Sequence, residues 1–478
     1  VMKKQIKIFS KIEDEYLRER VNDVNDVGRR VLKNLVDENK LHDLDNLNEE
    51  LIVVAHDLSP SDTASMYNKN IIAFATDIGG RTSHTAIMAK SLGVPATVGL
   101  KEATLRVRNQ DFIIVDGRKG LVIIHPTEET RRSYESARER IQQFKNQYED
   151  IKDLPTETTD GHHVKILANL ELPEEIPHIH DMGAEGIGLY RTEYFYMNRI
   201  DLPNEEEQFE AYKHVAQAMG SKQVTIRTVD LGGDKFISSL QIPRDMYPFL
   251  GWRAIRFCLE RPDIFKTQLR AILRASSYGN IRIMFPMISG IDEFRKAVQI
   301  LDESKKSLWD EQVPFNEQIP VGAMIEVPSA ALTVDILAKE ANFFSIGTND
   351  LIQYSLAVDR VNEQTAALYD PNHPAIIRMI KKVIDDAHQK GVEVGLCGEM
   401  CSEPIHALIL LGLGLNDFSM SAQNILQIKK LIRSVSLEDA RKVAEGVLQL
   451  STSFDIENYA RKKLKELAPH IIQPDTSR

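Results

Sequence analysis

The segment 321–350 decides the fold: V-G-A-M-I-E-V-P-S-A-A-L-T-V-D-I-L-A-K-E-A-N-F-F-S-I-G-T-N-D. Apolar, strand-like runs begin at 321 and 343, and the residues between them, 329–339, have the pattern of a helix. The same alternation recurs outward from this unit. Further strand-like runs begin near 164, 186, 224, 281, 392 and 413, and helical segments lie between them, for example at 204–219, 291–305, 374–390 and 422–434.

Eight strands that alternate with helices predict a (β/α)₈ barrel, an α/β fold of the TIM type. The alternative is an open, doubly wound sheet. The barrel is favoured because the strand count is eight and no Gly-rich dinucleotide fingerprint is present.

A smaller, strand-rich region precedes the predicted barrel. Its short apolar runs are punctuated by Gly and Asp, as in buried strands, and lie at 51–55, 71–75, 112–116 and 121–124. The highly charged stretch 127–153 predicts a long helix with few apolar positions, which is typical of a spacer or of a solvated surface helix. Residues 13–37 predict an amphipathic helix that packs within its own domain.

The composition excludes some classes of partner. The formal charge of −11 at pH 7 disfavours nucleic acid or an anionic membrane, so a phosphate-bearing ligand needs a local cluster of basic residues. Cys258, Cys397 and Cys401 form neither a disulfide framework nor a metal-binding pair, which favours a reducing, cytoplasmic compartment. No apolar run of about 18 residues is present, so we expect no membrane insertion.

Polar side chains collect where the predicted barrel strands end. These residues are Arg191, Arg227, Glu326, the pair Asn349 and Asp350, the run Cys397-Gly398-Glu399 and, shortly after the sixth strand, Arg360. Active sites of such barrels form at the carboxyl ends of the strands. Guanidinium groups pair with phosphate and carboxylate oxygens, and two acidic oxygens on neighbouring strands suit Mg²⁺ when substrate oxygens complete its coordination. The pattern predicts a site for a small, multiply charged anion chelated to Mg²⁺; the alternative is a set of structural salt bridges around the barrel rim.

A second candidate site lies in the smaller region, where G-G-R-T-S-H-T (79–85) opens a predicted short helix at 84–91. The glycine pair lets a ligand approach the backbone closely, and a helix N-terminus favours an anion. A neutral imidazole can attack phosphorus and then carry the phosphoryl group. His84 is therefore the predicted nucleophile; the alternative is a structural surface histidine.

Several longer motifs resemble known enzymes. The motif G-G-R-T-S-H-T-A-I-M-A (79–89) resembles the phosphohistidine signature of enzymes that use phosphoenolpyruvate (PEP). The barrel motifs resemble enzyme I of the bacterial sugar phosphotransferase system: G-L-Y-R-T-E-Y (188–194), I-R-T-V-D-L-G-G-D-K (226–235), M-I-E-V-P-S-A (324–330), F-S-I-G-T-N-D-L-I-Q-Y (344–354) and G-L-C-G-E-M (395–400). The resemblance runs from about residue 13 to 450.

The resemblance implies a phosphoryl transfer from PEP to His84 with release of pyruvate, followed by transfer to the phosphocarrier protein HPr. It implies the following site residues: Arg191, Arg227 and Arg360 bind PEP with Asn349 and Asp350, Glu326 and Asp350 hold Mg²⁺, and Cys397 protonates the enolate. Arg253 is a further candidate for phosphate contact, and Thr63 is expected to support His84.

The resemblance also implies a domain organisation. Residues 1–46 would form part of a helical HPr-binding subdomain, 47–126 the phosphohistidine domain, 127–156 a linker helix and 157–478 the PEP-binding barrel, through which two copies would form a homodimer. Val1 falls inside the helical subdomain of the family pattern, through truncation or a mis-assigned start, so we expect weak transfer to HPr. One alternative is a relative of pyruvate phosphate dikinase or PEP synthase, which couple a similar histidine and barrel to an ATP-grasp domain. The other is a binding or regulatory protein that senses PEP without turnover.

Overall fold

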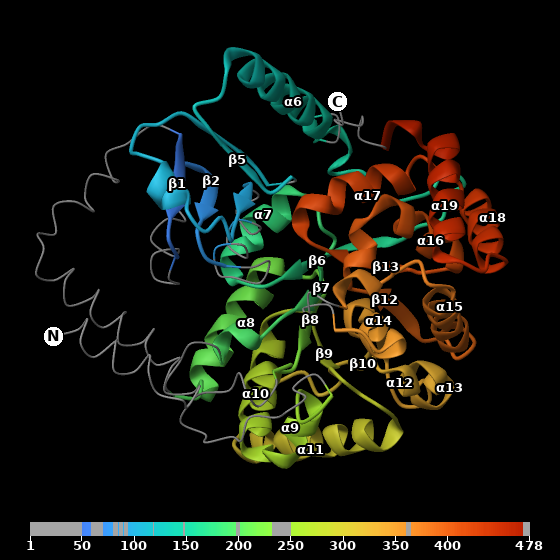
Figure 1. Ribbon diagram of the computed structural model, residues 1–478. Coiled ribbons are helices and arrows are strands. Elements are labelled where there is room, and N and C mark those ends of the chain that lie inside the picture. The colour runs from blue at the N-terminus through green and yellow to red at the C-terminus, as the bar shows by residue number, and fades with distance from the viewer. Residues whose placement is uncertain are drawn as a thin grey trace, which may run out of the picture. The chain divides into compact units, whose positions relative to one another are not determined.

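The computed structural model describes residues 50–58, 70–79, 85, 89, 94–117, 119–146, 149–196, 201–231, 250–359 and 365–471. The chain divides into two compact units, Val1–Ser136 and Ala137–Arg478, and the boundary falls within helix α6 (Glu128–Asn146) (Figure 1). The predicted helix at 13–37 lies outside the described residues. So does the predicted helix at 84–91, apart from Thr85 and Ala89.

The first unit contains two small sheets. Strands β1 (Leu51–Ala55), β2 (Ile71–Thr76) and β3 (Ala96–Thr97) are parallel, whereas β4 (Ile113–Asp116) and β5 (Leu121–Ile124) form an antiparallel pair. A short helix, α5 (Ala103–Arg106), follows β3. Phe74 is fully buried and packs with Leu58, Ile71 and Ala89 in a small apolar core. The apolar runs predicted in this region are therefore strands.

The second unit is a closed barrel of eight parallel strands, which confirms the predicted (β/α)₈ fold (Figure 1). The strands are β6 (Lys165–Leu170), β7 (Ile187–Tyr190), β8 (Val224–Arg227), β9 (Ile281–Phe285), β10 (Val321–Ile325), β11 (Phe343–Ile346), β12 (Glu393–Leu396) and β13 (Asp417–Met420). Every residue of β7, β8, β10, β11 and β13 is buried. Parallel strands that are covered on both faces read as continuous apolar runs, which is why the sequence pattern located them.

Helices surround the barrel in Figure 1. They are α7 (Ile176–Asp181), α8 (Glu205–Met219), α9 (Ile255–Glu260), α10 (Pro262–Ala275), α11 (Ile291–Asp310), α12 (Pro328–Leu332), α13 (Val334–Leu337), α14 (Thr348–Leu356), α15 (Pro374–His388), α16 (Pro404–Leu413), α17 (Ile425–Ile432), α18 (Leu437–Leu448) and α19 (Ser453–Leu467). Helix α16 is apolar on most of its surface because α18 and α19 also pack on it. A Cβ atom at Gly412 would lie 2.0 Å from the Ala440 carbonyl oxygen, so glycine permits the close approach of α16 to α18.

The barrel is closed by contacts between its first and last parts. Strand β13 pairs with β6, and Ser419 Oγ donates a hydrogen bond of 2.6 Å to Asn169 Oδ1. The Asp160 carboxylate accepts from the Leu437 backbone N–H at 2.9 Å and so caps α18. These contacts join segments that are far apart in the sequence.

Three predicted helices differ from the structure. The charged helix predicted at 127–153 is shorter, since α6 ends at Asn146 and Glu149–Ile151 form a 3₁₀ turn. The segment predicted as one helix at 329–339 is divided into α12 and α13 at Thr333, whose backbone leaves helical geometry (φ −117°, ψ 25°). The segment predicted at 422–434 opens with a 3₁₀ turn, Ala422–Asn424, before α17. Among the described residues, no helix has the length and apolar character needed to cross a bilayer.

Candidate active site

Those of the polar residues predicted near the strand ends that the structure describes lie at one end of the barrel. Arg227 ends β8, and Arg191, Glu326 and Cys397 directly follow β7, β10 and β12. Because all eight strands are parallel, their carboxyl ends meet at the same rim. Asn349 and Asp350 differ slightly from the expected position, since they lie in the first turn of α14 rather than at the end of a strand.

Arg227 is buried and is held by two carboxylates. Its Nη2 lies 2.8 Å from Glu193 Oε1, and its Nη1 lies 2.8 Å from Asp230 Oδ2. Burial alone would lower the pKa of Arg227, but the neighbouring carboxylates hold that pKa above its usual range. The guanidinium is therefore a fixed positive charge, whereas its Nε is buried and forms no hydrogen bond.

A second buried arginine, Arg253, shares one of these carboxylates. Its Nη2 lies 2.7 Å from Asp230 Oδ1, and its Nη1 lies 3.5 Å from Asp350 Oδ1 and 3.3 Å from the Tyr354 hydroxyl. Burial opposes the charge of Asp230, yet the Arg227 and Arg253 guanidiniums keep the pKa of that carboxyl below its usual range. Asp230 thus sets the spacing of two guanidinium groups.

Arg191 lies in a more open position. It pairs with Glu171, which directly follows β6, and the two side chains are 34% and 29% exposed. A ligand can therefore reach Arg191 from solvent more easily than it can reach Arg227, whose side chain is 10% exposed.

Glu326 is a buried carboxyl group at the same rim. Its Oε1 accepts from the Met287 backbone N–H at 2.6 Å, and Met287 adopts a left-handed conformation (φ 55°) that is strained for a non-glycine residue. Burial and the carboxylates of Asp350 and Asp230 raise the pKa of Glu326 to about 8.

These carboxylates fit a divalent cation. A positive ion beside Glu326 and Asp350 would offset the repulsion that raises the Glu326 pKa, and hard oxygen donors are the ligands that Mg²⁺ prefers. Within the described ranges, no group of three or more His, Cys, Asp or Glu side chains converges as a metal site. An ion held by two carboxylates would complete its coordination with water and substrate oxygens, as Mg²⁺ commonly does.

Cys397 lies in a small cluster of buried apolar residues. It packs with Leu189, Met284, Met324 and Phe343, and its Sγ lies 3.8 Å from the Ile346 carbonyl oxygen. Burial raises the pKa of the thiol, so Cys397 remains protonated at neutral pH. Beside it, the Glu399 backbone N–H donates to Asn349 Oδ1 at 3.2 Å, which connects α14 to the loop after β12.

The predicted residues His84, Arg360 and Thr63 lie outside the described residues. The structure in turn brings to the site three acidic residues that the sequence analysis did not single out: Glu171, Glu193 and Asp230. Glu193 and Asp230 lie within the motifs already quoted, close in sequence to Arg191 and Arg227 respectively. Their proximity to these arginines was the signal that could have identified them.

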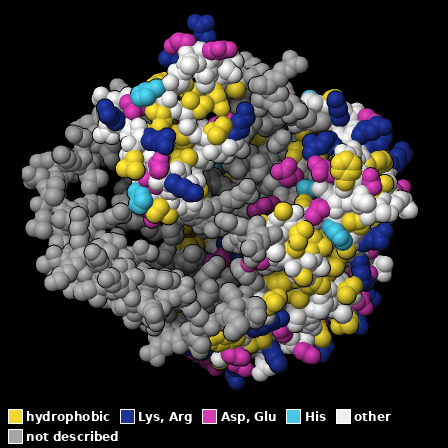
Figure 2. Space-filling model, in the orientation of Figure 1, with side chains coloured by type: hydrophobic (Ala, Val, Ile, Leu, Met, Phe, Trp, Pro, Cys, Tyr) yellow, Lys and Arg dark blue, Asp and Glu magenta, His cyan; other side chains and the backbone are white. Residues whose placement is uncertain are grey.

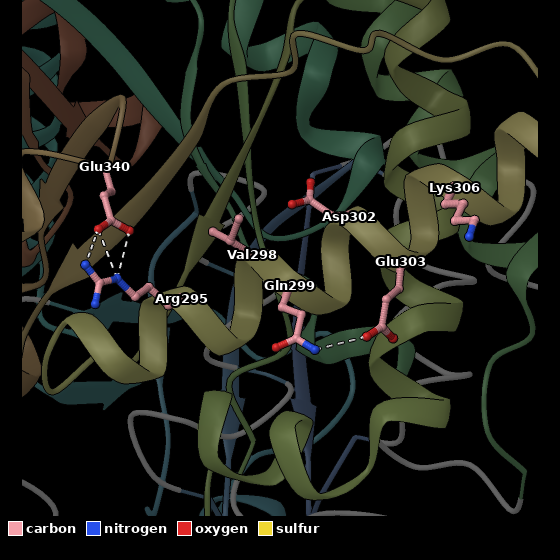
Figure 3. A pocket seen from close by; sticks show the side chains of 7 residues that line it. All are labelled: Arg295, Val298, Gln299, Asp302, Glu303, Lys306 and Glu340. Atoms are coloured by element: carbon pink, nitrogen blue, oxygen red, sulfur yellow. Dashed lines mark hydrogen bonds and ion pairs between the residues drawn. The ribbon is translucent and has the colours of Figure 1, made fainter.

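Two further features concern the surface. On the described part of the face in Figure 2, Lys and Arg side chains are interspersed with Asp and Glu. Figure 3 shows the side chains that line a pocket along α11, where Arg295 pairs with Glu340 at 2.6 Å and Gln299 donates to Glu303 at 3.3 Å. None of the residues that line this pocket ends a barrel strand, so it is separate from the candidate active site.

Comparison with protein families gives the class to which this barrel and its rim belong, the PEP-utilising enzymes. The model of their PEP-binding domain matches residues 145–437, and the model of their mobile domain matches residues 47–120.

Individual relatives narrow the class. The phosphoenolpyruvate-protein phosphotransferase of Geobacillus stearothermophilus is 49% identical over 457 residues, which are 96% of this chain and 79% of the relative. The enzyme of the same name from Bacillus subtilis (strain 168) is 47% identical over 460 residues, 96% of this chain and 80% of the relative. A solution structure of an Enzyme I protein is 45% identical over 30% of this chain and 56% of its own, with a TM-score of 0.23. The chain belongs to the phosphoenolpyruvate-protein phosphotransferase family.

Proposed function

We propose that this protein transfers the phosphoryl group of PEP to its own His84, releases pyruvate, and then passes the phosphoryl group to HPr as the first step of sugar uptake. The observation that carries the proposal is the set of guanidinium groups beside the buried pair Glu326 and Asp350 at one barrel rim. PEP has a phosphate and a carboxylate, which are the groups that such guanidiniums recognise.

Substrate binding is assigned to Arg191, Arg227 and Arg360, with Asn349 and Asp350. Each of the two described arginines already holds a carboxylate oxygen, so the anionic groups of PEP would replace contacts of the same chemical type. The positive charge that remains after this exchange stabilises the phosphoryl group as it moves, because phosphoryl transfer depends mainly on positioning and electrostatics.

The reaction breaks one bond and forms another at phosphorus. The neutral Nε2 of His84 attacks the phosphorus atom, the bond from phosphorus to the enol oxygen breaks, and that oxygen keeps the electron pair as an enolate. The Cys397 thiol, protonated at neutral pH, then gives its proton to carbon and pyruvate leaves. Solvent restores the proton on sulfur.

Mg²⁺ is assigned to Glu326 and Asp350, and when bound it would neutralise charge on the phosphate oxygens. Glu326 must lose its proton to act as a ligand, and burial alone makes that loss unfavourable. In this assignment Asp350 has two roles, since it is a metal ligand and also lies beside Arg253.

The domain assignment follows from the same proposal. Residues 47–126 carry His84, 127–156 form the linker that lets it move, 157–478 bind PEP, and 1–46 contribute to HPr docking. The protein would act in the cytoplasm, where PEP and HPr are available, as a homodimer paired through the barrel.

The test is labelling with PEP that is radioactive at phosphorus, followed by mapping of the labelled residue. We expect Mg²⁺-dependent label on His84 that is stable to base and labile to acid, as an N-phosphate is. The His84→Ala variant is the control and should take up no label. Label in that variant, or label from ATP without PEP, would refute the assignment.

A further inference from the structure

One buried amide lies behind the arginines of the rim. Gln268 is on α10, where Ile264, Phe265, Leu269 and Ile272 form the buried apolar stripe, and its own side chain is fully buried. An amide in such a place is unfavourable unless its donors and acceptor are satisfied. Gln268 satisfies them with residues that follow two strands and with Tyr212 on α8.

The contacts of Gln268 form a relay. Its Oε1 accepts from the Val229 backbone N–H at 2.9 Å, and its Nε2 donates to Thr192 Oγ1 at 3.0 Å and to the Tyr212 hydroxyl at 3.2 Å. Thr192 Oγ1 in turn donates to the Arg227 carbonyl oxygen at 3.0 Å. The amide thereby connects the chain after β7 to the chain after β8.

Thr192 and Val229, the partners of Gln268 near the strand ends, are close in sequence to two arginines of the site. Thr192 lies between Arg191 and Glu193 in the sequence. Val229 lies two residues after Arg227 and directly before Asp230. Fixing Thr192 and Val229 therefore fixes the backbone from which both arginines extend.

We propose that Gln268 is a positioning residue, which sets the relative placement of Arg191 and Arg227 for the binding of PEP. The inference rests on the proposed function, because it takes these two arginines as substrate ligands. Gln268 touches neither substrate nor reacting atoms and acts only through Thr192 and Val229.

The direction of the relay explains why an amide is needed. The Gln268 N–H donates to Thr192, which leaves the threonine O–H free to donate to the Arg227 carbonyl. An apolar side chain would supply neither contact. A carboxylate would accept from Thr192 instead and would leave the Arg227 carbonyl oxygen without this donor.

The first test compares Gln268→Met with a matched control, Gln208→Met. Gln208 is also buried and accepts from the hydroxyls of Tyr196 and Tyr212 at 3.2 Å each, so it shares Tyr212 with Gln268, but its hydrogen bonds to described residues include neither Thr192 nor Val229. Binding of PEP in the presence of Mg²⁺ would be measured by calorimetry, with the melting temperature of each variant measured alongside.

We expect Gln268→Met to weaken PEP binding by about 10- to 100-fold, since small displacements of binding groups have effects of this size. Gln208→Met should leave PEP binding nearly unchanged, even if it lowers the melting temperature equally, because it disturbs only Tyr212 and leaves the contacts of Gln268 to Thr192 and Val229 in place. Equal losses of binding in the two variants, or no loss in Gln268→Met, would overturn the proposal.

The second test uses Gln268→Glu, which keeps the shape of the side chain. A buried carboxyl is neutral below its raised pKa, and in that form it can both accept from Val229 and donate to Thr192. At the acidic end of the range in which the protein is folded, its PEP dissociation constant should approach the wild-type value measured at the same pH. The proposal would be overturned if, at this pH, the PEP dissociation constant of Gln268→Glu exceeded the wild-type value by as large a factor as that of Gln268→Met does.

Arg191→Ala, measured in the same series, separates this inference from the proposed function. If Arg191→Ala binds PEP like the wild type, the substrate assignment is wrong. If Arg191→Ala loses PEP binding and Gln268→Met keeps it, only the role of Gln268 is wrong.

Discussion

Arg227 and Asp230 form a buried ion pair, with 2.8 Å between Nη1 and Oδ2 and with side chains that are 10% and 3% exposed. The same carboxylate holds Arg253, so one aspartate contacts two guanidiniums away from solvent. Breaking a buried pair leaves an uncompensated charge, and this cost exceeds the net stabilisation that the intact pair provides.

Replacing this aspartate should therefore destabilise the barrel strongly. We expect Asp230→Ala to lower the free energy of unfolding by about 3–5 kcal/mol, measured by urea denaturation. The control is Asp263→Ala, which removes a surface partner of Arg261 (2.7 Å, Asp263 side chain 62% exposed). This control should cost less than about 1 kcal/mol. Similar losses in the two variants would show that Asp230 is not the shared counterion of the site.

The pair Glu171 and Arg191 should affect affinity rather than stability. Since Glu171 competes with an incoming anion for the Arg191 guanidinium, Glu171→Gln should tighten PEP binding by about two- to fivefold, the size expected of a partly exposed pair. Inhibition by inorganic phosphate should strengthen in parallel. Weaker PEP binding in Glu171→Gln would mean that the carboxylate positions Arg191 and does not compete with substrate.

Cys397 should contribute to turnover and not to binding. Its proposed role is to protonate the enolate, so Cys397→Ala should slow pyruvate release by about 10²- to 10⁴-fold and leave the PEP dissociation constant nearly unchanged. Cys258→Ala is the matched control, because Cys258 is also a buried thiol but lies on α9. If Cys397→Ala releases pyruvate as fast as the control, Cys397 is only a packing residue.

The raised pKa of Glu326 predicts that metal binding releases a proton. Its pKa is raised to about 8, so near pH 7 the free protein holds a proton that a bound cation must displace. Binding of Mg²⁺ with PEP at pH 7 should release close to one proton, and the release should vanish near pH 9. Calorimetry in buffers of different ionisation enthalpy measures this number.

The same pKa has a consequence for stability. A carboxyl whose pKa is higher in the folded state binds more protons when folded than when unfolded. Without metal, this contribution is fully present below the unfolded pKa of about 4.5 and is lost as the pH rises through about 8. The Glu326→Gln variant should lack both this pH dependence and the proton release. A variant that still releases a proton would assign the titration to another group.

The barrel could be predicted from sequence because its strands are covered on both sides and therefore appear as apolar runs. The carboxyl ends of those runs located Arg191, Arg227, Glu326 and Cys397, since parallel strands in a barrel deliver their ends to one rim. Helix boundaries were less certain, as Thr333 shows, because a single residue can leave helical geometry without a change in the apolar pattern.

The partner that Arg227 finds across strands could not be predicted from sequence. Glu193 meets Arg227 because β7 and β8 are neighbours in the closed ring, and pairing across strands has no local signature, whereas Asp230 lies only three residues after Arg227. Gln268 is the intermediate case. A lone amide in the apolar stripe of α10 indicates that a polar partner must lie inside, but not which strand provides it.

The hydrogen bond between Ser419 and Asn169 joins residues that are 250 positions apart. Because β6 and β13 are neighbours in the ring, a ribosome must translate nearly the whole barrel before its first strand can meet its last partner. Until then one side of β6 remains an open strand edge, and such edges recruit other chains. We therefore expect this open edge to expose the nascent protein to misassociation until its final strand emerges.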